Sequence, residues 1–464
     1  MFEDSSSLTM AAAASETKRR KCMADYHAML ERIDLSEFAQ QLRHDMDERN
    51  IKYGDRIVCP FLRPSFVTRE QISLMQDRVG KIAGALHILA EYVMHDVKLQ
   101  DFLGLTDIER ELISFDPKYS CLSATSRFDT FLNGGTCRFV EYNAESPAGI
   151  GYSDAMSNIF MRRPEFRDFV QEHRISTFDI SKSLMESLMQ CWKEYSGGSD
   201  RKPVIAIVDF IEGLPTRHEF FMLAEYFASC GCRTLVADQR ELDYDGKRLS
   251  FQGTEIDMIY RRVLTNEFIE KIDEEQNMYK AVKDGNVCVA NSFRSKIMHK
   301  KNIFALLTDE RYHEFFTSEQ IEAIRACVPW TRRFEECSTT DPDGKAADLL
   351  KFVRKNRSNL VIKPNDCYGG RGIFFGWEQN EREWDKSIEA ALAGDYLVQV
   401  KIPVARELFP SWSEKKGLEW GEYLVDLDPY AFGGQMQGAT ARLSLSSLCN
   451  VTSGGGSIPC MVLD

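Results

Sequence analysis

Residues 127–147 read RFDTFLNGGTCRFVEYNAESP, two apolar stretches in which polar residues recur two positions apart. The letters NGG between the stretches favour a tight turn, so the segment predicts a β-hairpin with strands RFDTFL and CRFVEYNAE. Residues two apart on a strand share one face of the sheet. Arg127 therefore points with Asp129 on the first strand. Glu141 points with Asn143 on the second strand, and the hairpin brings the two pairs side by side.

The polar set on this hairpin predicts a magnesium site. Asp129 and Glu141 offer carboxylate oxygens, and Asn143 offers a carboxamide oxygen. Mg²⁺ prefers a few protein oxygens, completed by water and by substrate phosphates. The alternative is a charged cross-strand pair on a solvated face, but a carboxamide with two acids makes a poor ion-pair set.

A second segment, residues 360–375 (LVIKPNDCYGGRGIFF), predicts a phosphate-binding hairpin. An apolar strand would carry Lys363 near its end, and a loop with three glycines would lead into a second apolar strand. Glycine lets backbone N–H groups approach phosphate oxygens closely, and the lysine supplies positive charge. The three glycines are Gly369, Gly370 and Gly372. The segment lacks the G-x-x-x-x-G-K-[ST] pattern of the common P-loop, and the alternative is an ordinary glycine turn.

A third segment, residues 438–457 (GATARLSLSSLCNVTSGGGS), places Arg442 in an apolar strand. Arginine can clamp a transferring phosphoryl group, so Arg442 is a candidate for that role. Asn450 and the triple glycine 454–456 follow, and the glycines suggest either a hinge or a backbone anion site. The alternative for Arg442 is an ordinary surface arginine.

Residues 203–236 change in character and predict a parallel sheet. PVIAIVDF is a continuous apolar strand, an amphipathic helix spans about 216–229, and CRTLVAD is a second strand. A β-α-β unit of this kind pairs its strands in parallel. The loop DFIEGLPTRHE that follows the first strand has no G-x-G-x-x-G, which argues against a nicotinamide-dependent oxidoreductase.

Two helices are also expected outside this unit. Apolar residues three and four positions apart predict a long helix from about Thr68 to Lys98. The stripe consists of Met75, Val79, Ile82, Leu86, Leu89 and Val93. Residues 294–308 (RSKIMHKKNIFALLT) predict a second helix that carries several lysines.

Length and composition narrow the class of protein. The chain has 464 residues, which suggests about three domains at roughly 150 residues each. Its 58 Lys and Arg against 71 Asp and Glu give a formal net charge of −13, which argues against a nucleic-acid partner or an anionic membrane. The 13 cysteines include no C-x-x-C, and such scattered thiols indicate a reducing compartment, the cytoplasm. No apolar run reaches the roughly 18 residues that span a bilayer, and residues 1–20 are expected to form a flexible tail.

Together these segments resemble the circularly permuted ATP-grasp ligases, most closely the synthetase domain of glutathionylspermidine synthase. That family carries an R-x-D strand followed by E-[FY]-N-A-D-[ST]-P. Here the motifs read R-F-D at 127–129 and E-Y-N-A-E-S-P at 141–147, and the step between their acids is 141 − 129 = 12, as in the family hairpin. Glu145 replaces the family's aspartate. We expect no amidase region before this part, and the ending SGGGSIPCMVLD is closer to other permuted ATP-grasp proteins than to the polyamine ligase.

The resemblance implies an α/β (α+β) fold, namely a permuted ATP-grasp fold with a smaller parallel β-α-β domain and N-terminal helices. The tail over 1–20 would precede a helical region over 21–200, which includes the metal-binding hairpin of the ATP-grasp core. A β-α-β domain of the pre-ATP-grasp kind would follow over 201–290. Residues 291–464 would form the nucleotide-binding lobes.

The resemblance also implies an ATP-dependent ligase that joins a carboxylate to an amine. ATP would phosphorylate the carboxylate, the amine would attack the acyl phosphate, and an amide or peptide bond would form with release of ADP and phosphate. ATP and Mg²⁺ are the implied cofactors, and the implied partners are a small acid and an amine, such as an amino acid, a peptide or a polyamine. Two alternatives stay open: a catalytically silent ATP-binding regulator or scaffold, and a phosphotransferase that stops at a phosphorylated product.

Several residues take roles by resemblance to the family's motifs. Asp129, Glu141 and Asn143 would bind Mg²⁺. Arg127 and Arg442 would face the phosphates during catalysis. The residues that would contact the nucleotide are Lys301, Lys363, Gly369, Gly370, Gly372, Gln399 and Val400.

Two assignments remain between neighbours. KKNIFALL resembles the family helix whose lysine reaches ATP, and the register favours Lys301, with Lys296 and Lys300 close by. The substrate carboxylate needs its own partner, and arginine is the best bidentate clamp for one. The candidates for that partner are Arg63 in PFLRPSF and Arg261 or Arg262 in IYRRV, with a structural ion pair as the alternative for each.

Overall fold

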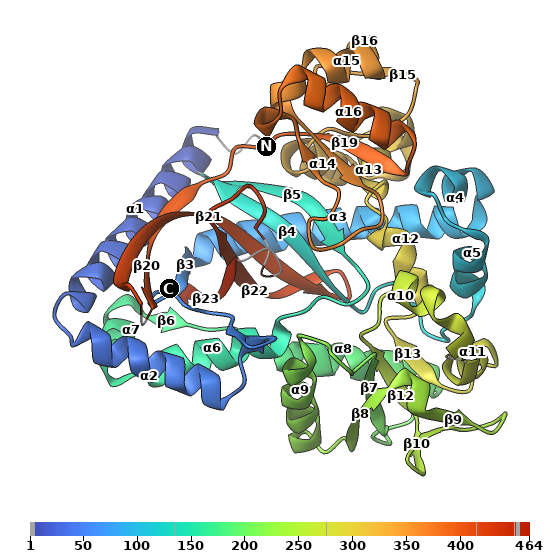
Figure 1. The fold of residues 1–464 in the computed structure, drawn as a ribbon, viewed down its shortest axis with the longest axis horizontal. Helices are drawn as coiled ribbons and strands as arrows, with labels where there is room; N and C mark the ends of the chain where they lie inside the picture. The colour runs from blue at the N-terminus through green and yellow to red at the C-terminus, as the bar shows by residue number, and fades with distance from the viewer. Residues whose placement is uncertain (1–4, 134, 275, 414, 450, 452–454) are drawn as a thin grey trace.

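A large, mostly antiparallel sheet lies at the centre of the computed structural model, which describes residues 5–133, 135–274, 276–413, 415–449, 451 and 455–464. Its strand order is β3-β23-β22-β21-β4-β5, with β20 also paired to β21 and β6 to β23 (Figure 1). The strands are β3 Ser65–Thr68, β4 Thr125–Asn133, β5 Thr136–Asn143, β6 Ile175–Ser176, β20 Arg406–Ser413, β21 Gly417–Phe432, β22 Gln435–Ser444 and β23 Gly456–Leu463. The sheet therefore joins the predicted hairpin, β4 and β5, to strands from the end of the chain.

The predicted hairpin is confirmed. β4 and β5 pair antiparallel, with Arg127 opposite Asn143 and Asp129 opposite Glu141. The register shifts directly after Asp129, which leaves the N–H of the next residue free for another partner. Gly134, in the expected turn, lies outside the described residues.

Helix α3 (Arg69–His95) covers one face of the large sheet and is the predicted long helix. Thr68 caps its first turn: the Thr68 side chain accepts a hydrogen bond from the N–H of Gln71, and the Gln71 side chain accepts one from the N–H of Thr68. All six residues of the predicted apolar stripe are fully buried. Figure 1 shows the helix running behind the strands, so this stripe supports the sheet that carries the hairpin.

The β-α-β prediction is also confirmed. β7 (Ile205–Asp209), α9 (Arg217–Ser229) and β8 (Thr234–Asp238) belong to a parallel sheet with the order β13-β12-β7-β8. β12 (Met258–Arg261) and β13 (Cys288–Ala290) complete that sheet. Every residue of β7 is buried, as expected for a strand that is covered on both faces.

A small antiparallel sheet carries the second predicted segment. Its order is β14-β19-β17-β18, and the glycine loop joins β17 to β18. Its strands are β14 Thr331–Arg333, β17 Leu360–Pro364, β18 Phe374–Phe375 and β19 Tyr396–Val400. Helices α15 (Leu349–Lys355) and α16 (Glu381–Leu392) pack their buried residues against this sheet, at the top of the view in Figure 1.

From its fifth residue the expected flexible tail belongs instead to helix α1 (Ser5–Leu30). The hydroxyls of Ser15 and Thr68 hydrogen-bond each other, and Arg19 forms an ion pair with Glu407 at 2.5 Å. The helix has no clear apolar stripe, so its sequence gives no amphipathic signal. Contacts with residues that are distant in the sequence explain why it is ordered.

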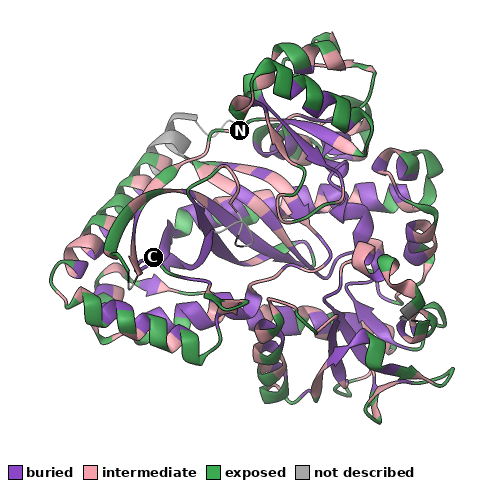
Figure 2. Ribbon diagram, in the orientation of Figure 1, coloured by how far each residue is buried: buried purple, intermediate pink, exposed green. Residues whose placement is uncertain are grey.

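The remaining elements surround these three sheets. Most buried residues lie in the sheets and in the helices directly against them, while the outer helices are exposed on one side (Figure 2). The other helices are α2 Leu35–Glu48, α4 Val97–Leu103, α5 Asp107–Ser114, α6 Ile150–Arg162, α7 Arg167–His173, α8 Ile180–Tyr195, α10 Thr265–Glu270, α11 Gln276–Lys283, α12 Lys296–His299, α13 Ile303–Leu307 and α14 Ser318–Cys327. The short strands are β1 Lys52–Tyr53, β2 Arg56–Ile57, β9 Leu242–Tyr244, β10 Leu249–Phe251, β11 Thr254–Ile256, β15 Ser338–Thr340 and β16 Ala346–Asp348. Among the residues described, no helix has the length and apolar character needed to cross a membrane.

Candidate active site

One cavity of about 820 Å³ is lined by residues of the large sheet, the parallel sheet and the small antiparallel sheet. It brings together most of the residues that the sequence singled out. The predicted residues that line it are Arg127, Asp129, Glu141, Asn143, Arg262, Lys301, Lys363, Gly369, Gly370, Gln399, Val400 and Arg442. Gly372, Arg63 and Arg261 lie outside its lining.

The hairpin contributes a hydrogen-bonded polar cluster to the cavity. Asp129 accepts hydrogen bonds from Asn143 at 2.8 Å and from Arg127 at 3.2 Å, both on the same carboxylate oxygen. Its side chain is 16% exposed, and that of Glu141 across the hairpin is 18% exposed. The two carboxylates are thus largely removed from solvent but still open to the cavity.

Arg442 ties this cluster to the centre of the large sheet. It lies on β22 opposite Asp426 of β21. Its guanidinium forms ion pairs with Asp129 and Asp428, each at 2.7 Å, and with Asp426. Our reading of the sequence missed Asp426 and Asp428. The available signal was LVDLDPY at 424–430, in which two acids two positions apart interrupt an apolar strand.

These acids differ in how readily they carry a proton. Burial raises the pKa of Asp129, but Arg442 and Arg127 outweigh burial and hold that pKa at about 2. Burial also raises the pKa of Asp426, and it raises that of Asp428 well above the ordinary range, in both cases against the attraction of Arg442. An anion that reaches this end of the cavity therefore meets Arg127 and Arg442. Of the acids beside Arg442, Asp426 and Asp428 take up a proton more readily than Asp129 does.

A break between α12 and α13 brings Lys301 to the cavity. We expected one helix over 294–308, but Lys300 has an extended conformation and ends α12. The N–H of Lys301 donates to the carbonyl of Asn365 at 3.0 Å. Its ammonium donates to the carbonyl of Cys367 at 2.6 Å and lies 3.3 Å from Glu141. The N–H of Lys301 therefore bonds to Asn365, close to the glycine loop, and does not continue the helical hydrogen bonds of α12.

The other two lysines of this segment are used elsewhere. Lys296 and Lys300 both donate to Asp366, at 2.6 and 2.9 Å. Lys300 also lies 3.0 Å from Glu109, and neither ammonium lines the cavity. Of the three candidates, Lys301 is the one that the structure brings to the cavity.

Lys363 reaches the cavity from β17. Its ammonium donates to the side-chain oxygen of Gln399 at 2.9 Å and to the carbonyl of Val140 at 3.5 Å. Burial lowers the pKa of Lys363; Glu141 opposes this effect and Lys301 reinforces it. Two lysines from separate segments therefore act electrostatically on one acid of the hairpin.

The glycine loop depends on backbone conformations that favour glycine. Gly369, Gly370 and Gly372 have φ values of +73°, +76° and +74°. A Cβ at Gly370 would lie 2.8 Å from a methyl carbon of Leu448, so this loop closely approaches the segment that follows β22. Gly372 lies instead against Tyr396 of β19 and Pro364 of β17, and it does not line the cavity.

The segment after β22 closes the cavity beside the glycine loop. It contributes Ser447, Leu448, Cys449 and Val451 to the lining. Asn450 and Gly454 of the predicted anion site lie outside the described residues, while Gly456 begins β23. The carbonyl of Gly455 accepts a hydrogen bond from Arg56 at 2.8 Å.

Gln399 and Val400, two of the expected nucleotide contacts, are already hydrogen-bonded within the small sheet. Gln399 accepts from Lys363 and donates to the Thr331 hydroxyl at 3.0 Å. The N–H of Val400 donates to the carbonyl of Trp330 at 3.0 Å. Apolar residues of the small sheet and of the segments next to it also line the cavity. They are Val361, Ile373, Phe375, Trp377, Ile402 and Pro403.

Arg63 and Arg261 are structural rather than part of the cavity. Arg63 is fully buried, donates to Glu407 at 3.2 Å and lies 3.8 Å over the ring of Phe409. Arg261 is fully buried and pairs with Glu145 at 3.3 Å. Buried ion pairs account for both, while Arg262 alone of the three arginines lines the cavity.

The hairpin side of the cavity carries oxygen donors of the type that binds a divalent cation such as Mg²⁺, and Arg442 and Lys301 now pair with two of its acids. Asp129, Glu141 and Asp426 present carboxylates to the cavity. Asn143 could offer its oxygen if its amide turned over, because its nitrogen now donates to Asp129. Oxygen ligands of this kind are those that Mg²⁺ prefers.

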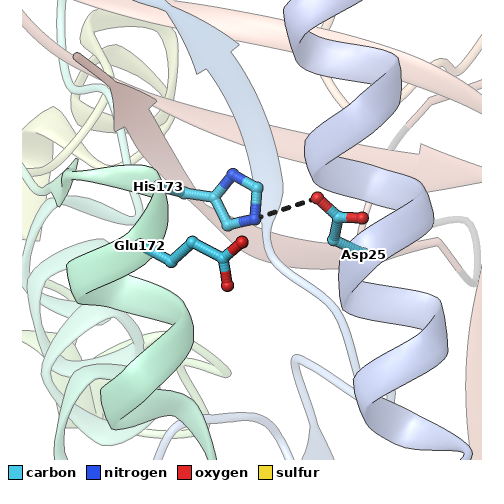
Figure 3. A group of neighbouring side chains, drawn as sticks. All are labelled: Asp25, Glu172 and His173. Carbon is cyan, nitrogen blue, oxygen red and sulfur yellow. Dashed lines mark ion pairs between the residues drawn. The ribbon is translucent and has the colours of Figure 1, made fainter.

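The described residues contain one compact group of potential metal ligands, and it lies away from the cavity, between α1 and α7. Asp25, Glu172 and His173 bring ligand atoms within 4.8 Å of one another (Figure 3). His173 lies 3.3 Å from an oxygen of Asp25, and the same oxygen accepts a 2.6 Å hydrogen bond from Lys21. These contacts make the group an ion-pair cluster that joins the two helices.

No protein-family model matches the chain. Among curated proteins, uncharacterized proteins of Mycobacterium bovis and Mycobacterium tuberculosis are each 22% identical to it over 351 residues, or 71% of this chain. The chain spans 58% of the length of these relatives.

Solved structures show what the fold resembles. The apo form of a glutathione synthetase-like effector from Globodera pallida is similar over 92% of this chain and 96% of that chain, with a TM-score of 0.60 and 13% identity. The ATP-grasp ligase PsnB overlaps 55% of this chain with a TM-score of 0.29 and 14% identity. The first similarity extends along nearly the whole chain. It confirms the mixed α/β fold class and the expected resemblance in fold to ATP-grasp ligases, while the permuted chain order stays a prediction.

Proposed function

We propose that this chain is an ATP-dependent ligase that joins a small carboxylic acid to an amine, with ATP and Mg²⁺ as cofactors. One observation carries the proposal: Lys301 and Lys363, on separate segments, meet the acidic β4–β5 hairpin within one cavity. Phosphoryl transfer needs such a combination of cations and metal ligands around the phosphates. The similarity in fold to a glutathione synthetase-like protein supports the same class of reaction.

The proposed reaction has two steps. A carboxylate oxygen attacks the γ-phosphorus of ATP, the bond to the bridging oxygen breaks, and ADP leaves. The amine nitrogen then attacks the acyl carbon, the carbon–oxygen bond to phosphate breaks, and the nitrogen loses a proton to solvent. The amide and inorganic phosphate remain. Positioning and charge neutralisation are the main tasks of the protein in such chemistry.

The residues divide these tasks. Arg127 and Arg442 neutralise charge on the transferring phosphoryl group, because both guanidinium groups line the cavity beside the hairpin. Lys301 and Lys363 hold the nucleotide phosphates. Asp129, with Glu141 and Asn143, holds Mg²⁺, which supplies further positive charge at the phosphates. The nucleotide base packs against the apolar part of the cavity lining beside β19, which includes Phe375 and Trp377.

The proposed parts of the chain follow from these roles. Residues 291–464 supply both lysines, the glycine loop and Arg442, as expected of nucleotide-binding lobes. Residues 21–200 supply the metal hairpin, and residues 201–290 supply the parallel sheet. All 13 cysteines are free thiols, which supports a reducing compartment such as the cytoplasm.

The test measures ADP release with a panel of acids and amines, with hydroxylamine among the amines. Release of ADP together with a hydroxamate requires an acyl phosphate and supports the ligase. A phosphorylated product without hydroxamate would indicate a phosphotransferase instead. Strong ATP binding with no ADP release under any condition would overturn the proposal in favour of a silent ATP-binding regulator. The variant Glu141→Gln, purified in the same way, controls for contaminating ATPases.

A further inference from the structure

The cavity extends past the hairpin to the carboxyl edge of the parallel sheet. Asp209 is the last residue of β7, Arg262 is the first residue after β12, and both line the cavity. The two strands pair in parallel with Arg261 opposite Val208. Asp209 and Arg262 therefore lie level with each other on neighbouring strands.

This pair of strands is the point where the sheet changes direction. The strand order is β13-β12-β7-β8, so the chain moves from β7 to one side and later returns to the other side at β12. Ligands of open α/β sheets bind in the crevice outside the carboxyl ends of the strands at such a switch point. Asp209 and Arg262 flank that crevice.

Arg262 is held rigidly and keeps one donor unused. It donates to the carbonyl of Pro147 at 2.8 Å and to the hydroxyl of Tyr260 at 3.0 Å, and it lies 5.3 Å from the ring of Phe220. Its side chain is only 3% exposed, and its guanidinium lies 3.8 Å from an oxygen of the fully buried Glu219. Its buried Nε has no hydrogen-bond partner among the described residues. A buried donor without a partner is costly unless a ligand satisfies it.

Asp209 offers the opposite charge at the same place. It is 6% exposed, and one of its oxygens accepts a hydrogen bond from the N–H of Phe210 at 2.8 Å. Within the described part of the chain, its other oxygen accepts no hydrogen bond. The apolar residues Leu214, Pro215 and Leu264 line the cavity beside this pair.

We propose that this edge binds the zwitterionic end of an amino acid or short peptide, with Arg262 on its carboxylate and Asp209 on its ammonium group. An α-amino acid carries a carboxylate and an ammonium group on one carbon. Here the ends of two neighbouring strands carry the complementary guanidinium of Arg262 and carboxylate of Asp209. The proposal rests on the proposed function, since it names the class of acid that the ligase would activate at a second, distal carboxylate. It places the α-carbon of the substrate, with its ammonium and carboxylate groups, at the parallel sheet and the reacting carboxylate nearer the hairpin.

Three matched compounds test the two contacts separately. L-Glutamate has both charges on its α-carbon, glutarate lacks the ammonium group, and 4-aminobutyrate lacks the α-carboxylate. Binding of each compound to the full chain is measured by calorimetry, without turnover. We expect L-glutamate, L-aspartate or L-2-aminoadipate to bind at least about tenfold more tightly than glutarate and 4-aminobutyrate, since each lost charged hydrogen bond weakens binding by about 10- to 100-fold.

Two variants identify the residue behind each contact. Asp209→Asn should weaken binding of L-glutamate about 10-fold or more and leave glutarate unchanged. Arg262→Lys should weaken L-glutamate and leave 4-aminobutyrate unchanged, because lysine keeps the charge but not the planar fork. Glu212→Gln is the matched control: its side chain lies near this edge, is 88% exposed and does not line the cavity.

Binding should also strengthen as the pH rises. Burial raises the pKa of Asp209 to about 7; the Phe210 N–H and Arg262 oppose this, and Glu267 on α10 and Asp238 on β8 add to it. The ionised carboxylate is the form that attracts an ammonium group. The affinity for L-glutamate should therefore increase from about pH 6 to about pH 8, and Asp209→Asn should abolish that increase.

The outcomes separate this proposal from the ligase proposal. If none of the three amino acids binds more tightly than glutarate and 4-aminobutyrate, the zwitterion site is wrong. It is also wrong if both variants bind L-glutamate as the wild type does. If L-glutamate binds as expected but no acid and amine together release ADP, the ligase assignment fails and the binding site stands. ATP binding by each variant, measured in parallel, shows that the fold is intact.

Discussion

The ammonium of Lys301 lies 3.3 Å from the carboxylate of Glu141, and both side chains line the same cavity. The lysine comes from the break between α12 and α13, and the glutamate comes from the hairpin strand β5. A half-exposed ion pair would contribute little to stability, but this one is largely buried. In the proposed complex with ATP and Mg²⁺, a phosphate would take the place of the acid beside Lys301, and the metal ion would take the place of the cation beside Glu141.

Removing the charge of Glu141 should abolish turnover and leave the fold intact. Glu141→Gln keeps the size of the side chain and removes one of the proposed metal ligands. We expect ADP release to fall by about 10²-fold, with the variant still folded by circular dichroism. The control Glu419→Gln removes an acid that is 47% exposed on the same sheet and should not alter the rate. Full activity in Glu141→Gln would remove this residue from the metal site.

Lys363 should contribute mainly to nucleotide affinity. Lys363→Met removes the cation and keeps most of the buried apolar stem, so we expect ATP affinity to fall by about 10- to 100-fold. Calorimetric titration with a non-hydrolysable ATP analogue measures this change. Lys351→Met, at a side chain 84% exposed, is the matched control. Unaltered affinity in Lys363→Met would show that the glycine hairpin does not hold the phosphates.

Arg442 should be essential for stability as well as for activity. Arg442→Met leaves Asp129, Asp426 and Asp428 without their shared cation. Removing one partner from such a buried set costs about 3–5 kcal/mol in the free energy of unfolding. The three acids would then resist ionisation in the folded state, so the variant should lose further stability as the pH rises. Urea unfolding at several pH values measures both effects, and an equally stable variant would contradict the ion-pair geometry.

Glu145 should stabilise the fold in a pH-dependent way. Burial raises its pKa, but Lys296, His299 and Arg261 outweigh burial and hold it at about 2. A carboxyl with a lowered pKa in the folded state stabilises above its ordinary pKa and loses that effect as the pH falls. We expect Glu145→Gln to lose about 3 kcal/mol at neutral pH, and the difference from wild type to shrink below about pH 4.5. Denaturant unfolding from about pH 3 to about pH 7 tests this, with the exposed Glu322→Gln as control. A difference that stays constant over this range would refute it.

Local patterns in the sequence predicted the elements that depend on nearby residues. The hairpin followed from a tight turn and from polar residues two apart, so the side chains of Asp129 and Glu141 were correctly paired. The helix over Thr68–Lys98 followed from a regular apolar stripe, and the parallel strands followed from the β-α-β order. In each case the signal lies within about 35 residues of chain.

Contacts between distant residues account for what the sequence did not predict. Lys300 ends a helix because Asn365, on another segment, binds the backbone of Lys301. Arg63 became a candidate for substrate binding because its partner Glu407 follows it by several hundred residues. No local pattern announces such a partner, since pairing of this kind is set by how the sheets pack. Asp426 and Asp428 were visible as alternating acids, but only the folded sheet brings them to Arg442.

The ion pair between Arg19 and Glu407 has a practical consequence for work on this protein. Glu407 also holds the buried Arg63, and its strand β20 is paired with β21, which carries the acids around Arg442. A shortened version that began after α1 would remove Arg19 and leave Glu407 with Arg63 as its remaining ion-pair partner, next to the strand that carries Asp426 and Asp428. Reporter proteins and affinity tags are therefore better attached ahead of this helix through a long spacer than substituted for it.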